Sequence, residues 1–131
     1  MCGITGIVNK NLINPKEKLN LSMDKLTDRG PDDRGIWISK DNKIFLGHTR
    51  LSIQDISNLG SQPMISQCKK YVIIYNGEIY NFNSLKGTLP KAVNYSLNSK
   101  SDTELLLNSL IHNGIETTCK FIDGMFSFAF F

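Results

Sequence analysis

The run YVIIY, residues 71–75, constrains the fold of this chain more than any other stretch. Its five residues are apolar without alternation, and this pattern is typical of a β-strand that is buried on both faces. A strand of this kind lies inside a layered domain, because each of its faces has to be covered.

Other strands are indicated on both sides of this run. GITGIV, residues 3–8, indicates a short strand whose two glycines leave room where a side chain would obstruct a neighbour. GIWIS and KIFLGHT are separated by a turn at residues 40–42 and predict a hairpin. The chain finishes in MFSFAFF, which predicts a further, aromatic-rich strand. An aromatic-rich strand at an edge favours aggregation, so we expect a C-terminally incomplete domain.

Two helices have clear start signals. Asn14 suits the N-cap and Pro15 the first helical position of a helix that Gly30-Pro31 stops. Its apolar positions are Leu19, Met23 and Leu26. Ser101 and Glu104 form a capping box for a helix that ends at Gly114, and a shorter helix is expected at residues 82–89. Strands that alternate with helices in mixed order predict the α+β class.

Composition narrows the class of protein. A chain of 131 residues with 40% apolar and 21% charged residues is a globular chain of one domain, residues 1–131. The net charge of +3 arises from interleaved charges, so neither nucleic acid nor membrane is an expected partner. The three cysteines match no disulfide framework and no metal site. Without a targeting segment or an apolar run of membrane-spanning length, the expected location is cytoplasmic.

Cys2 follows the initiator methionine directly, and this position has two interpretations. Once Met1 is removed, the thiol lies beside a free α-amine, and the reference pKa values of the two groups are about 8.5 and about 8. Such an amine can take the thiol proton and later return it to a leaving ammonia, so no histidine is needed. Alternatively, Met1 stays and Cys2 is a small packing residue.

Asn76-Gly77, in YVIIYNGEIYNF, also has two interpretations. Between two runs of strand type, Asn-Gly is the strongest short signal for a tight hairpin turn. In the functional interpretation, the pair lies at the end of the buried strand. The Asn76 side-chain amide and the Gly77 backbone N–H then stabilise an oxyanion, where one donor is typically worth about 10²- to 10³-fold in rate.

Two charged residues are candidates for amino-acid recognition. Arg50 follows a predicted strand, and its guanidinium can hold a carboxylate through two hydrogen bonds. Asp102 lies in the first turn of a predicted helix, where its commoner use is to complement the helix dipole, although it can also bind an ammonium. For RGPDDRG, residues 29–35, a helix stop followed by a turn is sufficient explanation. His48 is interpreted as a hydrogen-bonded strand histidine.

These stretches resemble a known family when taken together. MCGITGIV, DRGPDDRG, GHTRLSIQD, QPM, YNGEIYNF, SDTE and DGMFSFAFF occur in this order along the whole chain. They are similar to the N-terminal glutaminase domain of glutamine-hydrolysing asparagine synthetases, which are class II glutamine amidotransferases. The resemblance implies an N-terminal-nucleophile hydrolase fold, a four-layer αββα sandwich. Asp28 departs from the family pattern, which more often has His or Ser there, and lies outside the implied site.

The resemblance also implies roles for particular residues. Cys2 would be the nucleophile, Asn76 and Gly77 the oxyanion hole, and Arg50 and Asp102 the ligands of the α-carboxylate and α-ammonium of glutamine. Leu51, Ile53 and Glu78 would line the same pocket. The implied reaction is hydrolysis of glutamine to glutamate and ammonia through a Cys2 thioester, with no metal or other cofactor in this domain. ATP and magnesium are expected only in a C-terminal synthetase domain, which would use the ammonia to amidate aspartate.

Two other functions stay open at this point. The acceptor of the ammonia can be a sugar or another acid, in which case the chain is the glutaminase part of a different amidotransferase. A truncated chain can also bind glutamine without turnover, because missing strands would let water into the pocket.

Overall fold

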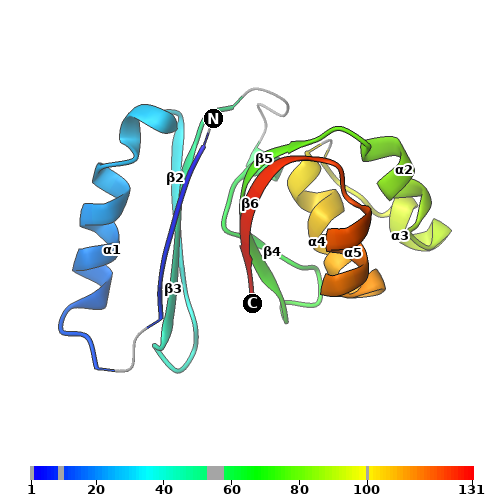
Figure 1. Cartoon of the computed structure of the whole chain (residues 1–131). Helices are drawn as coiled ribbons and strands as arrows, with labels where there is room; N and C mark the ends of the chain where they lie inside the picture. Colours follow the sequence, from blue (N-terminus) through cyan, green and yellow to red (C-terminus); the bar gives the residue numbers. More distant parts are fainter. Residues whose placement is uncertain (1, 9–10, 53–57, 100) are drawn as a thin grey trace.

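The computed structural model describes residues 2–8, 11–52, 58–99 and 101–131. They form four layers: helix α1, a first β-sheet, a second β-sheet, and the helices α4 and α5 (Figure 1). Both sheets are antiparallel. The predicted α+β class is confirmed at the level of two antiparallel sheets with helices.

The first sheet has the strand order β1-β3-β2. Its strands are β1 (Gly3–Val8), β2 (Asp33–Ile38) and β3 (Ile44–Arg50), so the predicted first strand and the hairpin are confirmed. Helix α1 (Pro15–Asp24) covers the outer face of this sheet through a small apolar core of Leu19, Met23 and Phe45. Asn14 is the N-cap, but its side chain donates a hydrogen bond to Glu17 (3.2 Å) instead of capping a backbone N–H. A 3₁₀ turn, η1 (Thr27–Arg29), leads to Gly30.

The second sheet has the order β4-β5-β6, and β5 (Val72–Ile79) is its centre. The residues Val72 to Tyr75 are all buried, which confirms the prediction from YVIIY for four of its five residues, whereas Tyr71 lies before β5 and is exposed. β6 (Gly124–Phe130) forms one edge. The other neighbour of β5 is β4 (Met64–Ile65). It was not predicted, because the sequence indicates only a polar loop here. The same loop contains the 3₁₀ turn η2 (Asn58–Gly60).

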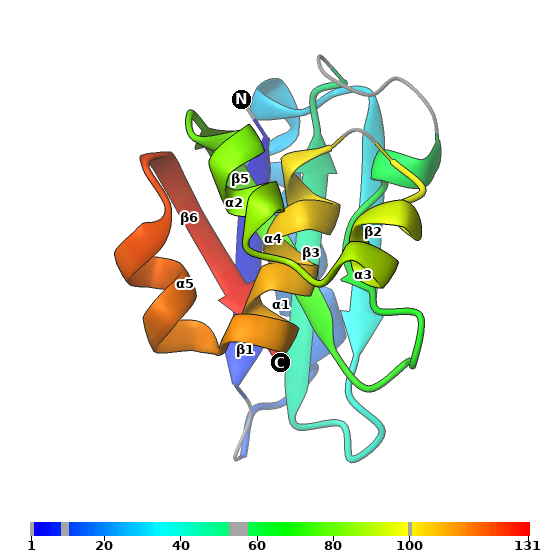
Figure 2. The ribbon, with the colours of Figure 1, turned by 90° about the vertical axis from the view of Figure 1, so that its right-hand side faces the viewer.

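The outer face of the second sheet is covered by helices (Figure 2). They are α2 (Phe82–Gly87), α3 (Lys91–Tyr95), α4 (Asp102–Asn113) and α5 (Ile115–Phe121). The largest apolar core of the described residues lies here, and it includes Ile73 and Tyr75 of β5 and Leu106 and Leu110 of α4. Half of the predicted capping box is present: Ser101 accepts the Glu104 N–H (3.4 Å), whereas the Glu104 carboxylate accepts the N–H groups of Asn98 and Ser99.

The two sheets pack against each other through a third apolar core. Leu46 of β3 contacts Val72 and Ile74 of β5 there. Trp37 of β2 extends this contact to Phe131, with ring centroids 5.2 Å apart. Because the sheets face each other directly, residues at corresponding ends of β1, β3 and β5 come close together. This end of the sandwich holds the candidate site.

Candidate active site

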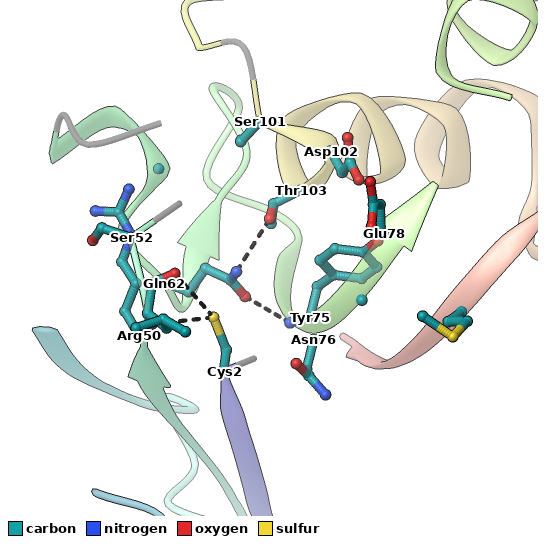
Figure 3. Close-up of a pocket in the computed structure, with 14 residues that line it drawn as sticks. Cys2, Arg50, Ser52, Gln62, Tyr75, Asn76, Glu78, Ser101, Asp102 and Thr103 are labelled. Carbon is teal, nitrogen blue, oxygen red and sulfur yellow. Dashed lines mark hydrogen bonds between the residues drawn. The ribbon is translucent and has the colours of Figure 1, made fainter. Parts of the chain in front are cut away.

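A pocket of about 280 Å³ lies at this end of the two sheets (Figure 3). Its wall includes each predicted site residue that the structure describes: Cys2, Arg50, Leu51, Asn76, Gly77, Glu78 and Asp102. Ile53, the remaining predicted site residue, lies outside the described residues. The pocket thus brings together residues that are up to 100 positions apart in the sequence.

Cys2 lies just before β1, and its sulfur is half-buried in the pocket wall. Sγ accepts a hydrogen bond from the Leu51 backbone N–H (3.4 Å) and lies 3.8 Å from the Leu51 carbonyl oxygen, to which the thiol can donate. The Cys2 carbonyl accepts a hydrogen bond from Arg29 Nε (3.2 Å). The residue is therefore held by groups that leave its sulfur facing the pocket. The two glycines of β1 allow close packing: a Cβ at Gly3 would meet Thr49 and Leu26, and a Cβ at Gly6 would meet Leu46.

Arg50 ends β3 with only 6% of its surface exposed. Its Nη1 donates to the Ser61 hydroxyl (3.4 Å), and that hydroxyl donates to the Asp33 carboxylate (2.9 Å). A guanidinium that is buried among such groups loses little conformational freedom when it binds a carboxylate. Asp33 and its neighbour Asp32, which accepts the Ser52 N–H (2.7 Å), belong to RGPDDRG, so this stretch does more than form a turn.

Asn76 and Gly77 lie within β5, where they pair with Ser127 and Phe126 of β6. The hairpin-turn interpretation of Asn76-Gly77 is therefore wrong. A Cβ at Gly77 would overlap the Met125 carbonyl oxygen and the Phe126 Cα, so the close approach of β6 requires glycine here. The Asn-Gly pair is thus explained by strand packing and not by a reversal of the chain.

The pairing pattern also gives the direction of the Gly77 N–H. Val72 and Tyr80 direct their N–H groups towards the β6 side, to Phe131 and Asp123. Directions alternate along a strand, so odd-numbered residues of β5 direct theirs to the other side. Tyr75 and Ile79 confirm this, since their N–H groups bind Gln62 (2.6 Å) and Asp102 (2.8 Å). The Gly77 N–H lies between these two, on the edge that the pocket adjoins.

Asp102 is the first residue of α4 and is 6% exposed. Its Oδ2 accepts the Ile79 N–H (2.8 Å), which ties the start of the helix to the end of β5. The carboxylate therefore does more than complement the helix dipole. With Arg50 across the pocket, and with Glu78 also in the wall, the site presents a cation and carboxylates to anything that enters.

Seven residues of the pocket wall are absent from the predicted site, and two of them, Gln62 and Tyr75, contribute large polar side chains. Gln62 accepts the Tyr75 N–H and donates to the Thr103 hydroxyl (3.1 Å), as Figure 3 shows. Tyr75 contributes a buried side chain from the centre of β5. QPM and YVIIY drew attention to both stretches, but neither pattern by itself indicates that a glutamine amide or a tyrosine hydroxyl reaches a pocket.

His48 is buried in β3 with 1% exposure, which confirms a strand histidine, and its ring lies near the Tyr75 backbone. Neither ring nitrogen has a hydrogen-bond partner among the described residues. Burial lowers the pKa of His48 to about 4, and the positive charge of Arg50 contributes to the lowering. The imidazole is therefore neutral near pH 7 and does not line the pocket.

Over the described ranges, no group of three or more His, Cys, Asp or Glu side chains lies close enough together to hold a metal ion. No helix in the same ranges combines the length and the apolar character that a membrane span requires.

Known proteins similar to this chain point to one family. A family profile described as "Glutamine amidotransferase domain" matches residues 1–131. Glutamine-hydrolysing asparagine synthetase 3 of Bacillus subtilis (strain 168) is 41% identical over 133 residues, which cover 98% of this chain and 21% of the relative. Asparagine synthetase B of Escherichia coli (strain K12) is 39% identical over 137 residues, which cover 100% and 23%.

A putative asparagine synthetase 2 of Methanocaldococcus jannaschii is 36% identical over 148 residues, covering all of this chain and 28% of the relative. The chain thus spans between 21% and 28% of the length of these three relatives. The chain belongs to the glutamine amidotransferase domain family and is homologous to the N-terminal part of glutamine-hydrolysing asparagine synthetases.

Proposed function

We propose that this chain hydrolyses glutamine to glutamate and ammonia, with Cys2 as the nucleophile. The observation that carries the proposal is the pocket itself. It combines a thiol, a backbone N–H on a strand edge, a buried guanidinium and a buried carboxylate within about 280 Å³. A free amino acid has one carboxylate, one ammonium and, in glutamine, one reactive amide, so each group of the pocket has a matching group on the substrate.

The two ends of the α-amino-acid group are bound by opposite charges. Arg50 holds the α-carboxylate through its guanidinium, which the Ser61–Asp33 pair orients. Asp102 holds the α-ammonium, and its hydrogen bond from Ile79 fixes the carboxylate in place. Leu51 and Glu78 complete the wall around the substrate. The contribution of Ile53 stays a prediction. Charge complementarity at both ends selects a zwitterionic amino acid over a simple amide.

The reaction begins at Cys2 after removal of Met1. The freed α-amine takes the thiol proton, the sulfur attacks the side-chain amide carbon of glutamine, and the C–S bond forms. The Leu51 N–H, 3.4 Å from the sulfur, stabilises the developing thiolate. The α-ammonium of Cys2 then returns its proton to the departing nitrogen, so that ammonia leaves and a thioester remains. Water hydrolyses this thioester, which releases glutamate and restores the thiol.

The negative oxygen of each tetrahedral intermediate is held by Asn76 and Gly77. The direction of the Gly77 N–H, towards the pocket edge of β5, supports this assignment. The Asn76 amide would be the second donor. Two fixed donors in a largely buried site stabilise an oxyanion far more than water does, because they need no reorganisation.

The wider assignment concerns the protein to which this domain contributes. We assign the layers to the N-terminal-nucleophile hydrolase fold, with residues 1–131 as the amidotransferase domain. The ammonia would pass to a C-terminal synthetase domain that amidates aspartate with ATP and magnesium. The support is that the aligned part makes up only 21% and 23% of the asparagine synthetases of Bacillus subtilis and Escherichia coli. The cytoplasmic location stays a prediction.

The test measures glutamate release from glutamine by this chain and by Cys2→Ala. We expect Cys2→Ala to lose at least roughly 10³-fold in rate, because the nucleophile is removed. Cys119→Ala is the matched control, since Cys119 is exposed on α5 away from the pocket, and it should keep full activity. Full activity in Cys2→Ala would refute the nucleophile, and an active preparation whose intact mass still includes Met1 would refute the α-amine as the base.

A further inference from the structure

The hydroxyl of Tyr75 has no explanation in the fold. The ring belongs to the apolar core between β5 and α4, and the residue is only 3% exposed. Its hydroxyl oxygen is buried with no partner in hydrogen-bond geometry among the described residues, although it lies close enough to the Asp102 carboxylate for the two groups to interact. A buried polar group without a partner is costly, and phenylalanine would fill the same space without that cost. An unsatisfied hydroxyl in a pocket wall points to a ligand that satisfies it.

The surroundings of this hydroxyl define which ligand group fits. Tyr75 lines the pocket together with Asp102 and Glu78, and Figure 3 shows its ring on the same side as both. Burial raises the pKa of the Tyr75 hydroxyl, and the negative charges of Asp102 and Glu78 raise it further. The group therefore stays a neutral phenol, which donates one hydrogen bond and accepts others. Beside two carboxylates, the ligand group that fits best is a cation that carries N–H donors.

An α-ammonium needs more than one acceptor. It carries three N–H donors, whereas the Asp102 carboxylate already uses Oδ2 to accept the Ile79 N–H. A phenol oxygen beside that carboxylate supplies another acceptor, and its own proton can point to a carboxylate oxygen at the same time. The arrangement suits R–NH₃⁺ and offers much less to a substrate that lacks an amine.

We propose that the Tyr75 hydroxyl accepts a hydrogen bond from the α-ammonium of the substrate, and so forms the ammonium subsite together with Asp102. This inference rests on the proposed function, since it concerns the same pocket, and it adds a residue that determines specificity for an α-amino acid. Tyr75 acts on binding and not on the reacting amide, so its loss raises the dissociation constant and leaves the chemical step nearly unchanged.

The experiment measures binding by calorimetry in the Cys2→Ala background, where no turnover occurs. The ligands are glutamine and 4-carbamoylbutanoate, which is glutamine without its amine. Tyr75→Phe keeps the ring and removes only the hydroxyl. We expect it to weaken glutamine binding about tenfold or more, as is typical for a hydrogen bond to a charged group, and to change binding of the amine-free ligand less than twofold.

Tyr80→Phe is the matched control. Tyr80 is exposed and follows β5, outside the pocket wall, so its hydroxyl should be dispensable for both ligands. A thermal melt of each variant checks that the fold is kept. With Cys2 restored, Tyr75→Phe should raise the KM for glutamine by the same factor and keep kcat within about twofold.

Three outcomes would overturn the inference, and they separate it from the proposed function. Equal losses for glutamine and for 4-carbamoylbutanoate would show a structural role of the hydroxyl. Unchanged glutamine binding in Tyr75→Phe would show that the hydroxyl does not touch the ammonium, while the glutaminase proposal stands. Failure of the parent chain to bind glutamine at all would overturn both proposals together.

Discussion

His48 shows how one buried side chain makes stability depend on pH. Its imidazole lies on the same face of β3 as Leu46, without a hydrogen-bond partner among the described residues, and its pKa is lowered to about 4. In the unfolded chain a histidine titrates near about 6.5. Below that pH, His48 binds a proton in the unfolded state, whereas in the folded state it stays neutral down to about pH 4. The contribution of His48 to the free energy of unfolding is therefore fully present above pH 6.5 and is lost as the pH falls towards 4.

We expect this group to remove about 2 kcal/mol of unfolding free energy between pH 8 and pH 5. Urea unfolding of the parent and of His48→Leu at both values measures the effect. His48→Leu should lack this share of the pH dependence, while other titrating groups act equally in both chains. His112→Leu, a change of the exposed histidine in α4, should behave like the parent. Identical pH dependence in the parent and His48→Leu would contradict the assignment.

At the scale of elements, Gln62 joins three segments that local sequence patterns treat separately. Its carboxamide accepts the Tyr75 N–H of β5 (2.6 Å) and donates to Thr103 of α4 (3.1 Å), from a position just before β4. A Cβ at Gly35 of β2 would overlap the Gln62 carbonyl oxygen, so the backbone here also packs tightly against the first sheet. The side chain thereby sets the distance between the strand with Gly77 and the helix with Asp102.

Gln62→Leu keeps the approximate size of the side chain but leaves the buried Tyr75 N–H unpaired. We expect the free energy of unfolding to fall by about 1–3 kcal/mol. Gln67→Leu is the control, because exposed Gln67 makes one hydrogen bond to Ser96 (3.3 Å), and its loss should stay within roughly 0.5 kcal/mol. Urea unfolding of the two variants gives the comparison. Equal losses of unfolding free energy would show that the buried hydrogen bonds of Gln62 stabilise the fold no more than the exposed one of Gln67.

The elements themselves were largely predictable from the sequence, because their signals are local. The apolar run in β5, the Asn14-Pro15 start of α1 and the capping residue Ser101 each act within one segment. β4 was not predicted, because a strand of two residues has no periodicity. The short helices α3 and α5 were not predicted either, because five and seven residues give too few repeats of an apolar pattern. Asn76-Gly77 misled the local interpretation, because the tight packing of β6 on Gly77 is a contact between distant segments.

The site was predictable only in part, for the same physical reason. Cys2, Arg50 and Asp102 were recognised by residue type and position, and each lies in the pocket wall. The contacts that hold them are long-range, such as Arg29 on the Cys2 carbonyl and Ser61 between Arg50 and Asp33. No spacing within the sequence encodes which hydroxyl or amide fills the gap between two distant strands, and so Gln62 and Tyr75 were missed.

For the whole molecule, the packing of the two sheets decides the geometry of the pocket. Cys2 and Arg50 come from the first sheet, whereas Asn76 and Gly77 come from the second. The core between the sheets, with Leu46 against Val72 and Ile74, therefore sets how far the thiol lies from the oxyanion donors. The outer core of Leu19, Met23 and Phe45 holds only α1 on the first sheet.

Leu46→Ala and Met23→Ala test this difference, since Leu46 is 4% and Met23 0% exposed. Both should lower the free energy of unfolding by about 2–5 kcal/mol, because both leave a cavity in a packed core. Only Leu46→Ala should also lower kcat/KM for glutamine, since a displacement of about 1 Å between reacting groups can cost roughly 10²-fold. Assays at a temperature where both variants stay folded separate the effects. An equal loss of kcat/KM in Met23→Ala would mean that general stability, and not the spacing of the sheets, governs the reaction.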